Sequence, residues 1–173
     1  MRLESPLLDQ DEGLIAQKKA IMEKRIVKGV VKEGHRVASG MAEDDRFPEG
    51  TLALQMPRFA ERGLDLSSYH RGTLNVSIAP RLFQIGKSWK SLPNVKWSPD
   101  MPAENFSFYR CDIRPAGMKS FEEGLVYWPH PSTKPEFQQD PSVLEILAPF
   151  IKEAHYGSEM DLLFDPDEIE ITH

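Results

Sequence analysis

The stretch Gly72-Thr73-Leu74-Asn75-Val76-Ser77-Ile78 decides the fold class of this chain. After the glycine, polar and apolar residues alternate. In a strand, the leucine, valine and isoleucine would therefore share one face, and the threonine, asparagine and serine the other. The apolar face suits a core. The polar face offers hydroxyl and amide oxygens, the hard ligands that magnesium prefers. From the pattern alone, the solvated side of a half-buried strand remains the alternative.

The composition indicates one domain with a short extension, because the chain has 173 residues and 40% of them are hydrophobic. The net charge of -6 disfavours a nucleic-acid backbone or an anionic membrane as partner, while a local positive pocket could still bind a nucleotide. The single cysteine, Cys111, excludes an internal disulfide and fits a reducing compartment. Since no stretch approaches the ~18 apolar residues of a membrane span, we expect a soluble, cytoplasmic protein.

Residues 1–24 form the predicted extension. From Asp11 onward, apolar residues recur in pairs about seven positions apart, at 14–15 and 21–22, which predicts an amphipathic helix. Such a helix would pack on the main domain or on a second subunit, and the sequence leaves the oligomeric state open.

Residues 25–173 form the predicted main domain, which is mostly β. We expect a strand over 50–55 followed by a short helix over 56–63, a long loop over 79–102 with room for one short strand, and a helix from 149 to about 156. Many short strands with few helices favour a small closed barrel. Alternation predicts the remaining strands over 25–32, 105–114, 124–128, 143–147, 160–164 and 168–172.

Two short motifs carry a resemblance to a known family. The segment 69–76, YHRGTLNV, and the segment 143–149, VLEILAP, resemble two motifs of the CTP-dependent riboflavin kinases of archaea, in the same order along the chain. The similarity spans roughly residues 26 to 172. It implies a closed six-stranded β-barrel of mostly-β (α+β) class, with two or three short peripheral helices and loops that cradle the ligand. The implied activity is magnesium-dependent transfer of phosphate from CTP to riboflavin, giving FMN.

The resemblance also implies roles for particular residues. Thr73 and Asn75 match the pair that binds magnesium between the nucleotide phosphates. Thr133 and Glu145 match residues that bind the flavin. Glu145 is also the expected catalytic group, since it could orient the attacking hydroxyl and accept its proton.

The nucleotide side matches less well. Gly40 remains from a loop that is rich in glycine in the family, but residues 43–45 are three carboxylates, which repel phosphates unless a metal lies between. Arg46 could compensate for this charge. Near the end of the second motif, Glu153 reverses a basic position of the family, and Lys152 could substitute for it.

These departures leave an alternative of a different class open, a small-molecule-binding barrel or interaction domain without kinase activity. Other site types are excluded by pattern. The chain has no G-x-G-x-x-G fingerprint, no G-x-x-x-x-G-K-[ST] loop, no H-E-x-x-H motif and no second cysteine to form a zinc site.

Overall fold

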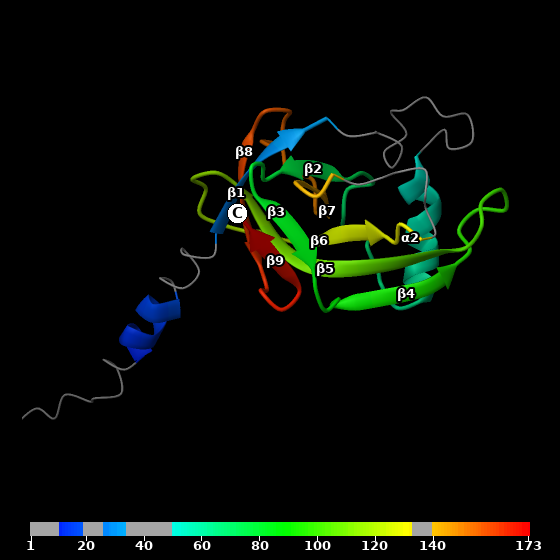
Figure 1. The fold of residues 1–173 in the computed structure, drawn as a ribbon, viewed down its shortest axis with the longest axis horizontal. Helices are drawn as coiled ribbons and strands as arrows, with labels where there is room; N and C mark the ends of the chain where they lie inside the picture. Colours follow the sequence, from blue (N-terminus) through cyan, green and yellow to red (C-terminus); the bar gives the residue numbers. More distant parts are fainter. Residues whose placement is uncertain (1–10, 19–25, 34–49, 133–139) are drawn as a thin grey trace, which may run out of the picture.

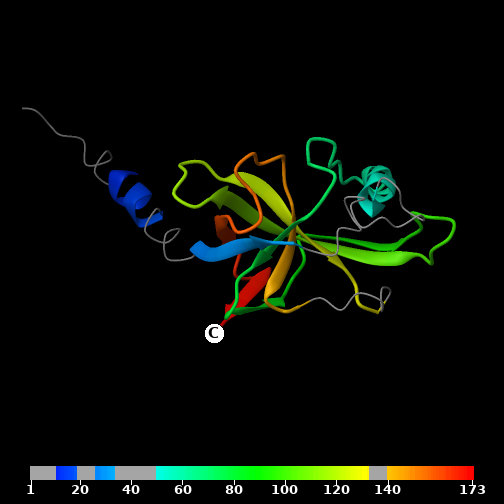
Figure 2. The same cartoon turned by 90° about the horizontal axis from the view of Figure 1, so that it is seen from above.

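The computed structural model describes residues 11–18, 26–33, 50–132 and 140–173. Figures 1 and 2 show a body of antiparallel strands with a helix packed at one end. Its elements are β1 (Ile26–Lys32), α2 (Thr51–Glu61), β2 (Leu74–Ser77), β3 (Leu82–Ile85), β4 (Lys90–Val95), β5 (Glu104–Pro115), β6 (Glu122–Pro129), β7 (Val143–Leu147), β8 (Glu159–Phe164) and β9 (Ile169–Thr172). A second helix covers residues 11–18, which confirms the helix predicted from Asp11 over the part described.

The strands form one seven-stranded sheet and one two-stranded sheet. The large sheet has the order β4-β5-β6-β7-β2-β1-β8, and β8 also pairs with β5. The pairings β1–β2–β7–β6–β5–β8 therefore return to β1 and form a ring of six strands. The prediction of a mostly-β domain is confirmed, and closure of this ring into a barrel stays a prediction.

The strands of the ring share one apolar core. The alternation of 72–78 places Val76 and Ile78 in this core, and Leu74 packs against it, as predicted. A buried carboxylate on β8, Asp161, ties the neighbouring strands together by pairing with Lys28 of β1 and Arg114 of β5. The buried residues of this core are Val31, Val76, Ile78, Phe83, Tyr109, Cys111, Ile113, Val126, Leu144, Ile146, Ala148, Met160, Leu162, Phe164 and Ile169.

A second core lies between α2 and the opposite face of β4, β5 and β6. Phe59 of α2 makes edge-to-face contacts with Phe106 and Phe108 of β5, at centroid distances of 5.0 and 5.3 Å. The helix thus covers one end of the sheet, as Figure 1 shows. The buried residues of this core are Leu52, Phe59, Leu64, Leu66, Leu92, Val95, Trp97, Phe106, Phe108, Leu125, Tyr127 and Leu147.

The prediction of a strand over 50–55 is wrong, because α2 begins at Thr51 and includes residues 51–55. Its buried positions Thr51, Leu52, Gln55 and Phe59 follow helical spacing and face the second core. Gly50 precedes the helix with φ 89°, a backbone angle that glycine adopts without strain. Over so few residues, the alternation of small and apolar side chains resembled that of a strand.

The prediction for 79–102, a long loop with room for one short strand, is wrong in part, since the segment contains two strands, β3 and β4. β3 pairs with β9, and this small sheet is attached to β5 through Glu168, which accepts hydrogen bonds from the backbone and the guanidinium of Arg110. β4 pairs with β5 although it contains Pro93, as an edge strand permits.

The expected helix from 149 to 156 is replaced by turns. The chain must double back here, because Val31 of β1 exchanges backbone hydrogen bonds with Gly157 and Ser158. Among the described residues, none belongs to a helix long and apolar enough to cross a membrane.

Gly124 tests the close approach of strands within the ring. A Cβ added there would lie 2.7 Å from the Cys111 backbone oxygen and 3.0 Å from that of Leu147. We expect Gly124→Ala to lower the free energy of unfolding by ~1–3 kcal/mol in urea denaturation, because neither backbone oxygen can move away without disturbing its strand. Gly13→Ala is the control, since a Cβ there has no neighbour within 4 Å. Equal stability of Gly124→Ala and wild type would contradict this packing.

Candidate functional site

Three polar side chains are cross-strand neighbours on β1, β2 and β7. In the antiparallel registers, Asn75 lies opposite Glu145 on one side and opposite Lys32 on the other. Residues paired in this way project to the same face of a sheet. Lys32, Asn75 and Glu145, which we call the polar row, therefore lie together on the face opposite the ring core.

The polar row runs toward the core under α2. Beyond the pair Val126–Ile146, the register brings Tyr127 of β6 next to Glu145. The two are close enough for the charge of Glu145 to help raise the pKa of Tyr127. Exposure decreases along the polar row, from Lys32, which is exposed, to Asn75 and Glu145, which are half-buried. The neighbouring Tyr127 is buried.

Tyr127 belongs to a buried polar group at the helix–sheet interface. Its hydroxyl donates a 2.7 Å hydrogen bond to Oε1 of Gln55, whose Nε2 has no partner in the described part of the chain. Burial raises the pKa of Tyr127 well above its ordinary value, and the charges of Glu145 and Glu104 add to the effect. Tyr127 is therefore a neutral hydroxyl at physiological pH, fixed as a donor toward α2.

The oxygens near the polar row have the chemistry of a magnesium site. Thr73 is half-buried just before β2, and Asn75 and Glu145 are directly paired, so their Cα atoms lie roughly 4.5–5.5 Å apart. Within the described ranges, no group of three or more His, Cys, Asp or Glu could hold a metal. The residues present fit an ion that keeps water or phosphate oxygens as its remaining ligands, as magnesium commonly does.

Only some of the nucleotide-binding residues expected from sequence lie within the described part of the chain. Gly40 and Arg46 lie outside the described residues, as does the expected flavin-binding residue Thr133. Lys152 is exposed with Glu153 in a turn after β7. The sequence reasoning did not single out Lys32, because only the β1–β2 register brings it next to Asn75.

A serine–histidine pair elsewhere in the sheet is close enough to resemble a nucleophile and its base, but its role is structural. The Ser107 hydroxyl lies 2.7 Å from Nε2 of His130 and 2.9 Å from the hydroxyl of Ser91. Ser107 is only 3% exposed, within a strand that is paired along both edges. These hydrogen bonds therefore join neighbouring strands, and substrate cannot reach the serine.

Comparison with known proteins adds no assignment: no protein-family model matches the sequence, and no curated protein matches it.

Tyr127 and Gln55 provide a test of the interface that borders the polar row. Tyr127→Phe should lower the free energy of unfolding by ~1–3 kcal/mol, because it leaves the buried Gln55 without its only described partner. Gln55→Met in the same protein should restore most of this loss, since the unpaired amide is then removed. Urea denaturation of both single variants and the double variant measures the coupling. Losses that simply add would contradict the hydrogen bond.

Proposed function

We propose that this chain is a riboflavin-kinase-like phosphotransferase, a closed six-stranded barrel that transfers phosphate from CTP to riboflavin and produces FMN. One observation carries the proposal. Asn75 and Glu145 come from the two motifs that resemble the family, far apart in sequence, and β2 and β7 pair them directly. Residues implied to bind the metal and the flavin are therefore neighbours, as a transfer between two ligands requires.

In this proposal the polar row lies where nucleotide and acceptor meet. The hydroxyl of Thr73 and the amide oxygen of Asn75 would hold magnesium, which neutralises charge on the phosphates when bound. Glu145 hydrogen-bonds the terminal hydroxyl of riboflavin and accepts its proton as the oxygen bonds to the γ-phosphorus. The bond from that phosphorus to the bridging oxygen breaks, and CDP leaves with both electrons of that bond. Thr133 contributes to flavin binding.

Positive charge near the phosphates comes from several residues. The resemblance places Gly40 at the nucleotide, and Arg46 and Lys152 would supply cations that compensate there for departures from the family pattern. The structure adds Lys32, whose position opposite Asn75 supports a contact between its ammonium group and a phosphate. A cation at this point offsets the three carboxylates at 43–45, which otherwise repel a triphosphate.

A second candidate function is flavin or nucleotide binding without phosphate transfer. It is favoured by the carboxylates at 43–45, in place of the family's glycine loop, and by Glu153, exposed beside Lys152. Both departures affect the nucleotide and leave the flavin residues Thr133 and Glu145 in place.

FMN formation distinguishes the two candidates. The purified chain with riboflavin, CTP and magnesium should produce FMN, measured by chromatography with fluorescence detection. Glu145→Gln should lower kcat by ~100-fold or more while nucleotide binding persists, since it removes the proton acceptor and keeps the shape. Asn75→Ala should instead weaken nucleotide binding roughly tenfold, through loss of an interaction with a charged group.

Matched controls lie on the small sheet. Gln84→Ala and Glu170→Gln change the same chemical groups at exposed positions of β3 and β9 and should leave both quantities unchanged. Thermal stabilisation by riboflavin without FMN formation would support the binding candidate. If neither riboflavin nor CTP with magnesium binds, both candidates are wrong.

Lys32 gives a separate prediction about the nucleotide. Lys32→Ala should weaken CTP binding roughly fivefold at low salt, which corresponds to ~1 kcal/mol for one exposed unit charge near 4 Å. Calorimetry should show this difference shrinking as salt rises, because the interaction is screened. Lys87→Ala, an exposed lysine between β3 and β4, is the control. An effect of Lys32→Ala that does not depend on salt would contradict a charge contact.

A further inference from the structure

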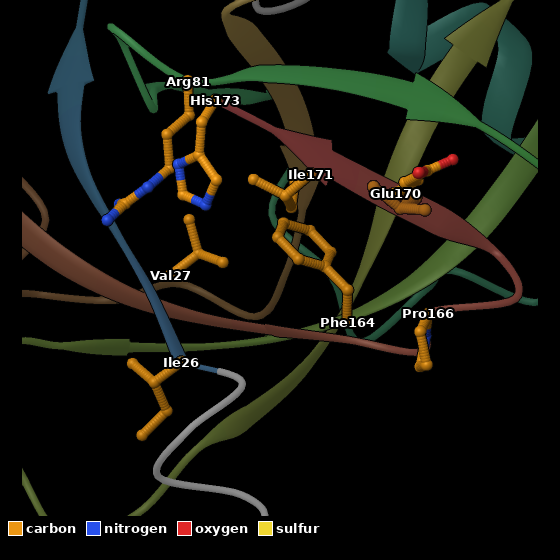
Figure 3. Close-up of a pocket in the computed structure, with 9 residues that line it drawn as sticks. Ile26, Val27, Arg81, Phe164, Pro166, Glu170, Ile171 and His173 are labelled. Atoms are coloured by element: carbon orange, nitrogen blue, oxygen red, sulfur yellow. The ribbon is translucent and has the colours of Figure 1, made fainter.

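A pocket of about 350 Å³ opens near the first residues of β1, at the other end of that strand from Lys32. Figure 3 shows Val27, Phe164 and Ile171 in its middle, with Arg81 and His173 along one side. Six of the nine lining residues are apolar and three, Arg81, Glu170 and His173, are polar, so an apolar side chain placed against the apolar part would be removed from water. The residues that line it are Ile26, Val27, Arg81, Phe164, Pro166, Ile169, Glu170, Ile171 and His173.

The positive side of the pocket has a simple structural origin. Leu82 of β3 pairs with Thr172 of β9, so Arg81 and His173 are the next neighbours across this small sheet. They continue the face that carries Phe83 and Ile171. Neither Arg81 nor His173 has an ion-pair partner among the residues that the structure describes. A ligand with an apolar part and a carboxylate could pack its apolar part on Val27, Phe164 and Ile171, which we call the apolar floor. Its carboxylate could then pair with Arg81 or His173.

The helix at 11–18 has this combination of groups. Asp11, Leu14, Ile15 and Lys18 are spaced at i, i+3, i+4 and i+7 and share one helix face. In the structure this helix lies apart from the sheets (Figure 1) and all its residues are exposed, Leu14 by 50% and Ile15 by 66%. Isolated helices shorter than ~12 residues are marginal in water, so a helix of this length depends on packing against another surface.

We propose that the 11–18 helix packs into this pocket of its own chain, with Leu14 and Ile15 on the apolar floor and Asp11 beside Arg81 and His173. The chain connection permits it. Ile26, which lines the pocket, follows Lys18 by eight positions, a span of up to ~26 Å when extended. The opposite charges of Asp11 and Arg81 select this orientation of the helix over the reverse one.

Paramagnetic relaxation measures this contact directly. A nitroxide at Ala16→Cys lies on the outer helix face, and the natural Cys111 is buried and would stay unlabelled. The amide signals of Val27, Phe164 and Ile171 should be lost with the oxidised label and return on reduction. Unchanged signals at all three amides would overturn the proposal.

Two pairs of variants identify the contacts. Asp11→Arg should abolish the signal loss, and adding Arg81→Asp should restore it, since the charges are then exchanged. Leu14→Ser with Ile15→Ser should abolish it, whereas Gln17→Ser on the outer face should not. These outcomes support the docked helix. Signal loss that persists in both Asp11→Arg and the double serine variant would overturn it.

A mixing experiment distinguishes docking of the helix within its own chain from docking into a second copy of the chain. Isotope-labelled protein without nitroxide is combined with nitroxide-labelled protein that carries no isotope. Intact signals in this mixture support docking within one chain. Loss of the Val27 and Ile171 signals in the mixture would show that the helix enters the pocket of a neighbouring molecule and would overturn the proposal.

Discussion

The arrangement of the whole domain depends on how the two edges of β5 are used. One edge pairs with β6 along most of its length, while the other is shared, with β4 pairing at 104–108 and β8 at 111–115. Because β5 is bonded on both sides, the chain of pairings returns through β8 to β1 and the six strands form a ring. β2 and β7 then have each other as neighbours inside that ring, and their register sets Asn75 against Glu145.

The two faces of these strands have different environments. One face forms the ring core, while the core under α2 lies on the other face of β4, β5 and β6 and reaches β7 only at its last residue, Leu147. The outward face of β1, β2 and β7 carries the polar row beyond the helix. Small-molecule sites combine apolar walls with a few well-placed polar groups, and the proposed site would combine the polar row with the neighbouring apolar interface. The proposed function uses both properties.

The sequence predicted the parts of the fold that depend on local pattern. The alternation at 72–78 identified β2 and its buried face, and the alternation at 105–114 identified β5 as a strand, although both faces of β5 are buried. The first turn of α2 was missed, since burial of Gln55 depends on Tyr127, which is distant in sequence. β3 was missed because four residues acquire strand structure from pairing with β9 and show little pattern of their own.

The candidate site, too, could be predicted from sequence only where it depends on local pattern. Asn75 and Glu145 were selected from sequence through their motifs, but their direct pairing, and the place of Lys32 beside them, follow from strand register, which single-sequence patterns do not contain. The measurement that tests the central claim most directly is an amide chemical-shift titration with riboflavin and with CTP plus magnesium. The account predicts the largest shifts at Lys32, Thr73, Asn75 and Glu145. Saturable shifts confined to other residues, or none with either ligand, would contradict it.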